Sequence, residues 1–187
     1  IPEHYPMLKP IMTFFPEGDK SIGIAQLKET SRNAFYARTE AQYYLLRILY
    51  EEEQNLEEAS QLSAYLTEQY PNNSYFQTYY GRILYRLGKY DDAKVIFESI
   101  LDRVIAEQHG YEYNTARYAT YFLGNIWKSY GNLTESKKYY NSCVKYAFLA
   151  NALEKGYYFY SLIHLGEIAV LEKEFNLALQ YFKKVRK

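Results

Sequence analysis

A repeat of 34 residues constrains the fold of this chain more than any other feature. Ala59 and Ala93 lie 34 positions apart. Before each of them lies a segment in which a small or polar residue has bulky residues around it, and the same pattern occurs twice more, later in the chain. The four such segments are Tyr43-x-x-Leu46-Arg47-x-x-Tyr50, Gln77-x-x-Tyr80-Gly81-x-x-Leu84, Thr120-x-x-Leu123-Gly124-x-x-Trp127 and Leu162-x-x-Leu165-Gly166-x-x-Ala169. A period of this length is typical of arrays in which each pair of helices packs on the next pair.

The chain reads as helix nearly throughout from residue 19. Apolar residues recur three and four positions apart, and strand-like alternation is missing from the pattern. We expect a first helix over about 19–32 and then four helix pairs, together forming one array over 19–187. The pairs are 35–53 with 56–69, 74–87 with 90–108, 112–129 with 133–152, and 156–172 with 175–187.

The first 18 residues differ from the rest, because they hold four of the five prolines. Proline removes a backbone donor and blocks the helix behind it. We therefore expect residues 1–18 to form an extended entry segment, with one short turn near Ile11–Phe15.

Turn-forming residues occupy the joints between the expected helices. Gly88 and Gly131 can take the positive φ that often ends a helix. Asn55, with Glu58 three residues later, resembles a capping box. Asp91 is expected to cap the helix that begins near residue 90.

Small residues recur where the two helices of each pair should cross, since helix axes approach to about 8–10 Å only when the side chains between them are short. First helices carry Gly81, Gly124 and Gly166, and second helices carry Ala59, Ala93, Ser136 and Ala178. The glycine spacing grows to 43 and 42 residues, which amounts to about two additional helical turns. We expect the added length at the ends of helices 90–108 and 133–152.

Composition excludes several classes of function. The chain has 22 basic and 22 acidic residues, so it lacks the surplus of cations that a general nucleic-acid binder uses. The sequence contains no run of 18 apolar residues, so no transmembrane helix is expected from it. We expect a soluble chain without a targeting segment of its own, in a compartment that the sequence leaves open.

Catalytic and metal-binding patterns have little support. The one cysteine, Cys143, fits neither an internal disulfide nor a zinc site, and we expect it to be a small buried hydrophobic residue. His4, His109 and His164 lie far apart and belong to no ligand motif. The expectation is therefore a protein that is not an enzyme and uses no cofactor and no metal.

From about residue 34 to residue 187, the chain resembles the tetratricopeptide repeat family. The matching positions are Tyr43, Leu46, Tyr50, Ala59, Pro71, Gly81, Ala93, Phe97, Leu123, Gly124, Trp127, Leu165, Gly166, Ala178 and Phe182. Arg47, Ser63 and Ala169 depart from the family pattern. The longer spacing is similar to that of long-helix members such as the kinesin light chains. The resemblance implies an all-α, right-handed superhelical solenoid of antiparallel helix pairs, whose first helices line the concave face.

On that arrangement, the groove would be lined by first-helix residues that point away from the seam between paired helices. These are Tyr44, Tyr75, Thr78, Arg82, Tyr85, Arg86, Tyr118, Tyr121, Asn125, Lys128, Tyr160 and Glu167. Tyrosine and arginine are enriched at binding hot spots, and a cationic centre suits an acidic peptide or a C-terminal carboxylate. The leading hypothesis is a scaffold that binds a peptide or protein segment in this groove.

Three alternatives stay open. With 24 tyrosines in the chain, those in the groove could serve only to pack neighbouring helices. A second possibility is an assembly protein that forms homo-oligomers through its C-terminal helix. That helix has no polar capping helix after it in this sequence, and continuation of the protein beyond Lys187 is the leading explanation. The third is a carbohydrate or small-ligand receptor, because tyrosine faces can stack on sugar rings.

Overall fold

The computed structural model describes residues 19–154 and 156–185, and no strand lies among them. The chain divides into two compact units at Gln54 and Asn55. The expected entry segment over 1–18 lies outside the described residues, and a single array over 19–187 stays a prediction.

The first unit pairs two helices, α2 (Lys20–Asn33) and α3 (Arg38–Arg47). The carboxylate of Asp19 caps α2 by accepting hydrogen bonds from two backbone amides of its first turn. Inside the pair, the Gln42 side chain donates to the backbone carbonyl of Ser31 at 3.1 Å. The predicted helix over 19–32 is confirmed to within a residue.

The second helix of this unit ends in a different geometry from the one expected. The predicted α-helix over 35–53 begins at Arg38 and changes at Ile48 into the π-helical segment η2 (Ile48–Glu52). Such wide turns accommodate one extra residue in a helix. Gln54 then takes a φ of 52°, which breaks the helix at the boundary between the units.

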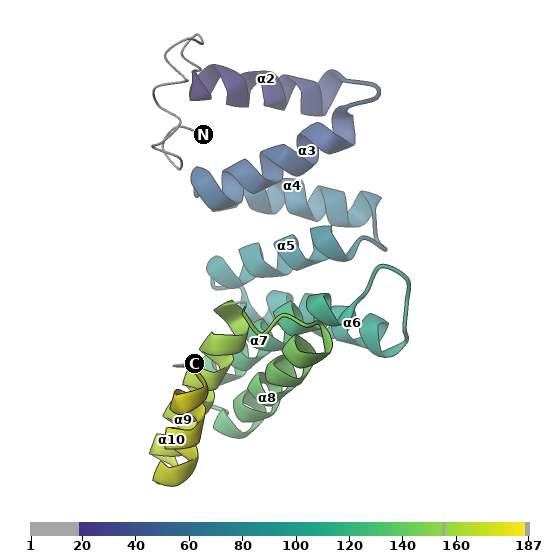
Figure 1. Cartoon of the computed structure of the whole chain (residues 1–187). Helices are drawn as coiled ribbons and strands as arrows, with labels where there is room; N and C mark the ends of the chain where they lie inside the picture. Colours follow the sequence, from purple (N-terminus) through teal and green to yellow (C-terminus); the bar gives the residue numbers. More distant parts are fainter. Residues whose placement is uncertain (1–18, 155, 186–187) are drawn as a thin grey trace. The chain divides into compact units, whose positions relative to one another are not determined.

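The second unit consists of seven helices within residues 55–154 and 156–185 (Figure 1). Their bounds are α4 (Leu56–Gln69), α5 (Ser74–Arg86), α6 (Tyr90–Ile105), α7 (Tyr113–Ser129), α8 (Leu133–Leu149), α9 (Gly156–Leu171) and α10 (Phe175–Val185). Helices α5 and α6, α7 and α8, and α9 and α10 pack as pairs. The predicted helix pairs are confirmed here, with ends that move by up to three residues.

Asparagine caps three helices of this unit, and one of these caps is the one expected at Asn55. The side chains of Asn55, Asn73 and Asn132 accept hydrogen bonds from first-turn amides of α4, α5 and α8. The prediction for Asp91 is wrong, because α6 begins one residue before it and places Asp91 inside the first turn. Its carboxylate instead accepts a hydrogen bond from the Tyr130 hydroxyl at 2.6 Å.

We call Gly81, Gly124 and Gly166, which lie where paired helices cross, the seam glycines. An aromatic ring of the second helix fills the space beside each of them. A Cβ added at Gly81 would lie 2.8 Å from the Phe97 ring, and one at Gly124 would lie 2.6 Å from the Tyr140 ring. The Phe182 ring covers Gly166 in the same way. The predicted crossing positions are therefore confirmed in all three pairs.

The additional length of the later repeats is spread more widely than expected. Helix α6 has 16 residues and α7 has 17, against 14 in α4 and 13 in α5. Part of the increase extends the ends of α6 and of α8, which has 17 residues, as predicted, and part adds a turn at the start of α7. Whole turns keep the apolar stripe of each helix on the same side.

Candidate interaction surface

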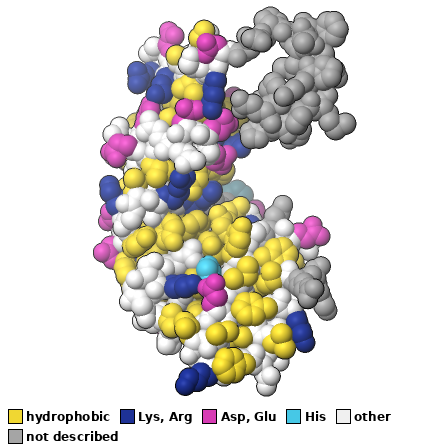
Figure 2. Space-filling model, turned by 90° about the vertical axis from the view of Figure 1, so that its left-hand side faces the viewer, with side chains coloured by type: hydrophobic (Ala, Val, Ile, Leu, Met, Phe, Trp, Pro, Cys, Tyr) yellow, Lys and Arg dark blue, Asp and Glu magenta, His cyan; other side chains and the backbone are white. Residues whose placement is uncertain are grey.

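Three first helices of the second unit, α5, α7 and α9, form a common surface that we call the first-helix face. Helix α7 lies in the middle and contacts both others. The Tyr85 ring of α5 packs 5.2 Å from the Phe122 ring of α7, and Lys128 of α7 pairs with Glu167 of α9 at 2.8 Å. Hydrophobic side chains also gather on one side of the molecule, around a small group of basic, acidic and histidine side chains (Figure 2).

Four tyrosines from α7 and α9 form a group of rings in mutual contact, the tyrosine ladder, made of Tyr118, Tyr121, Tyr157 and Tyr160. The Tyr121 ring lies 4.5 Å from the Tyr157 ring and 6.3 Å from the Tyr160 ring. Tyr118 meets Tyr157 edge to face at 5.0 Å. Partial burial raises the pKa of Tyr121, whereas Tyr160 is 52% exposed. The ladder is therefore a fixed aromatic surface with an accessible outer ring.

A charged group adjoins the ladder. The Lys128 ammonium donates to Glu167 Oε2 at 2.8 Å and lies 3.2 Å from His164 Nδ1. The same Nδ1 lies 3.0 Å from Glu167 Oε2, so it accepts from Lys128 in one tautomer and donates to Glu167 in the other. Partial burial acts to raise the pKa of Glu167, but hydrogen bonds from Lys128 and His164 hold it below its ordinary value. This part of the face is polar and nearly charge-balanced.

Two polar side chains predicted to line the groove already hold internal partners. Tyr140 donates its hydroxyl proton to Asn125 Oδ1 at 2.6 Å, and its burial raises the pKa of that hydroxyl. The Thr78 side chain is buried and donates to the backbone carbonyl of Ser74 at 2.7 Å. Both side chains therefore support the helices rather than form a free lining.

The α5 residues form a second aromatic and cationic group on the face. Tyr75 packs 4.8 Å from the Tyr79 ring, and the Arg82 guanidinium lies 5.1 Å from the centre of the same ring. Arg86 is exposed one turn further along. The last predicted residue, Tyr44, lies exposed on α3 and belongs to the first unit.

The structure thus brings together five of the predicted residues at the contact of α7 and α9: Tyr118, Tyr121, Lys128, Tyr160 and Glu167. Two further members of this contact, Tyr157 and His164, were not among the predicted groove residues. Both share the stripe of Tyr160 on the helix predicted over 156–172, since three- and four-residue steps return to the same face. This three- and four-residue spacing from Tyr160 could have identified both residues from the sequence.

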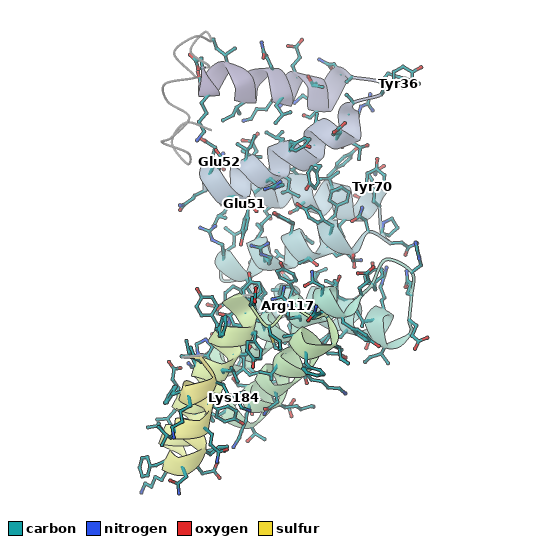
Figure 3. All side chains as sticks on the ribbon, viewed as in Figure 1. Tyr36, Glu51, Glu52, Tyr70, Arg117 and Lys184 are labelled. Atoms are coloured by element: carbon teal, nitrogen blue, oxygen red, sulfur yellow. The ribbon has the colours of Figure 1, made fainter. Side chains whose placement is uncertain are left out.

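Arg117 is the largest side chain in the core that sequence reasoning did not assign. It is 2% exposed and lies on α7 among packed side chains (Figure 3). Its Nε and Nη2 donate to Asn114 Oδ1 at 3.2 and 2.8 Å, and the guanidinium lies 4.8 Å from the centre of the Tyr118 ring. Arg117 therefore packs against the buried side of the tyrosine ladder, at Tyr118.

Cavities lie elsewhere on the second unit. One of about 490 Å³ adjoins the loop between α6 and α7, and one of about 480 Å³ is lined by residues of α8, α9 and α10. Among residues 19–154 and 156–185, no group of three or more His, Cys, Asp or Glu could hold a metal ion. Within the same ranges, no helix combines the length and apolar character needed to cross a membrane.

Neither a protein-family model nor a curated protein matches the sequence. The fold, however, matches solved structures. Residues 41 to the end of MamA from Desulfovibrio magneticus RS-1 superpose with a TM-score of 0.67 at 18% identity, over 98% of this chain and 92% of that one. A double mutant of MamA from RS-1 gives 0.67 at 18%, over 90% and 84% of the two chains.

BtubC from P. vanneervenii is similar as well, with a TM-score of 0.68 at 15% identity over 90% of this chain and 73% of that one. At these identities the similarity concerns the fold. It supports the resemblance to tetratricopeptide proteins as far as a helical repeat, while the right-handed sense of the superhelix stays a prediction. The chain therefore has an all-α helical-repeat fold similar to those of MamA and BtubC.

Proposed function

We propose that this protein is a non-enzymatic scaffold that binds a peptide or protein segment against the first-helix face of its second unit. The observation that carries this proposal is the tyrosine ladder, in which Tyr160 is 52% exposed while the rings beneath it are held in place. Aromatic side chains that are ordered before binding lose little conformational freedom when a partner arrives. They are also over-represented among residues that dominate binding energy.

The groups around the ladder favour a peptide over a purely apolar ligand. Lys128 and Glu167 lie beside it as a partly exposed ion pair. Such groups form the polar rim that typically surrounds an apolar contact. A segment with one large apolar side chain for Tyr160 and polar groups for the Lys128–Glu167 pair would match both features.

The polar side chains near the ladder support a role in binding rather than in catalysis. Lys128, His164 and Glu167 hydrogen-bond with one another, and Asn125 is held by Tyr140. They act together as a rigid edge of the surface.

Selection from a phage-displayed library of random peptides tests the proposal. Peptides selected on the intact chain are measured by fluorescence anisotropy against Tyr160→Ala, with Tyr65→Ala as the matched control. Tyr65 is a similarly exposed tyrosine, 44%, on the second helix α4. We expect Tyr160→Ala to weaken binding by about tenfold or more and Tyr65→Ala to leave it unchanged. Equal affinity of the two variants would show that the selected peptides do not bind at the first-helix face.

A further inference from the structure

A cavity recurs at three equivalent places in the second unit. Each one lies beside a loop that joins a second helix to the next first helix, and the volumes are about 500, 490 and 480 Å³. The first adjoins the loop after α4, the second the loop after α6 and the third the loop after α8. We call these the loop cavities. Volumes of this size are typical of small-molecule sites.

The openings are a regular feature of the repeat. In the first two cavities, residues at or just after the end of the next second helix form part of the wall without filling the space. They are Gly110 in the first cavity, and Leu149 and Ala150 in the second. Lys184, in the last turn of α10, has the corresponding place in the third cavity. The three cavities therefore differ in their lining side chains rather than in their position.

The first two loop cavities have mainly polar linings. In the first, the Ser74 hydroxyl donates to the Gly110 carbonyl at 2.5 Å, and the Asn72 side chain accepts a hydrogen bond from an arginine of α6. The lining of the second includes the carboxylates of Glu107 and Glu112. Neither lining favours an apolar ligand with a negative charge.

The third loop cavity differs from both, because its described lining is apolar apart from two lysines. The apolar part comes from α8, the α8–α9 loop and α9, and it consists of Val144, Phe148, Leu149, Leu153 and Tyr158. Phe148 is 71% exposed and Leu149 is 45% exposed. Large apolar side chains that remain in contact with water around a hollow are typical of ligand-binding sites.

Lys145 of α8 and Lys184 of α10 complete the described lining. Both side chains are exposed, and no acidic side chain within 19–154 and 156–185 pairs with either of them. A lysine side chain can lie along apolar surface while its ammonium group stays at the edge. Two cations beside an apolar hollow are therefore complementary to an anionic group that carries an apolar chain.

We propose that the third loop cavity binds a single-chain carboxylate amphiphile, with its chain against Phe148 and Leu153 and its carboxylate beside Lys145 and Lys184. Burial of the chain provides most of the affinity, since each methylene group removed from water strengthens binding by about threefold to fourfold. The lysines favour a charged head group over a neutral one. None of the lining residues belongs to the tyrosine ladder, so this site is independent of the proposed scaffold function.

Isothermal titration calorimetry of the whole chain with decanoate tests the ligand class. We expect one molecule of decanoate to bind, at least about tenfold more tightly than hexanoate because of its longer chain. Decanol has the same chain without the charge and should bind about fivefold more weakly than decanoate. A chain that does not bind decanoate, or one that binds decanol equally well, would contradict the inference.

Two variants of α8 test the place of binding. Lys145→Glu should weaken decanoate binding by about fivefold or more, because it replaces an attraction with a repulsion. Lys138→Glu is the matched control, since Lys138 lies about two helical turns earlier on the same stripe of α8 and does not line the cavity. Both side chains are exposed, so both variants should remain folded, as circular dichroism would check. Equal affinities of the two variants for decanoate would overturn the proposal.

Discussion

The Tyr140 ring leaves no room for a side chain at Gly124, where an added Cβ would lie 2.6 Å from two ring carbons. The ring cannot move away easily, because it is buried and its hydroxyl is held by Asn125. This contact explains why the repeat carries glycine at the crossing of its paired helices, and it gives a first prediction.

Gly124→Ala should lower the free energy of unfolding by about 1–3 kcal/mol, the usual cost of overpacking a core contact. Thermal and denaturant unfolding followed by circular dichroism would measure the loss. Gly23→Ala is the control, since it lies inside α2 with open space around it. That change should raise the unfolding free energy of its unit by about 0.5–1 kcal/mol through helix propensity. Equal effects of the two substitutions would contradict the assigned crossing.

Arg117 gives a second prediction, because it is a buried cation. Its Nη1 has no hydrogen-bond partner, and none of the ion pairs within 19–154 and 156–185 includes it. Arg117→Met keeps most of the volume and removes the charge, so it should leave stability unchanged or raise it by about 1–4 kcal/mol. Arg117→Ala should instead lower stability by about 2–5 kcal/mol through the cavity that it leaves. Urea unfolding of both variants distinguishes these effects, and a large loss with methionine would show that the charge itself is required.

The contact between Tyr130 and Asp91 predicts a pH dependence. The hydrogen bond to Asp91 raises the pKa of Tyr130 from 10.0 to about 12. A raised folded-state pKa favours the protonated form, so the contribution is complete below pH 10 and is lost as the pH rises from 10 to about 12. The site is exposed, so the effect on stability should be at most about 1 kcal/mol. NMR titration of the Tyr130 ring should show its pKa return toward 10 in Asp91→Asn, and an unchanged pKa would exclude the hydrogen bond as its cause.

Cys143 should react slowly with alkylating reagents. Burial raises the pKa of its thiol from 9.0 to about 11, which reduces the thiolate fraction near pH 8 by about a hundredfold. Mass spectrometry of iodoacetamide-treated protein would measure the rate, with the second cysteine of Val95→Cys as an exposed reference in the same molecule. Similar rates at the two sites would show that the α7–α8 core opens readily.

Much of the fold could be predicted from local pattern, because helix periodicity, asparagine caps and seam glycines act over a few residues. The bounds of α4 agree with the prediction to the residue. The same local rules failed at Asp91, where one residue of difference in the helix start moves a potential cap into the first turn. The π-helical segment at Ile48–Glu52 was also missed, since an extra residue in a helix turn leaves the apolar pattern almost unchanged.

The candidate surface was less predictable, because its contacts join helices that are distant in sequence. Lys128, His164 and Glu167 meet across 36 to 39 residues, and no local rule pairs them. Asn125 and Thr78 were correctly placed on first helices, but their hydrogen bonds, to Tyr140 of α8 and to the Ser74 carbonyl of α5, depend on rotamers that sequence does not specify. Function could be inferred only as far as a surface that suits peptide binding.

Within the second unit, each helix touches its neighbours in the chain and the nearest first helices, and α10 packs mainly on α9. Cooperativity in such an arrangement extends only from one repeat to the next. Pulled from its two ends, the unit should therefore yield in steps, with α10 detaching first and the central α7–α8 hairpin last, so that a mechanical load is released gradually instead of in one rupture.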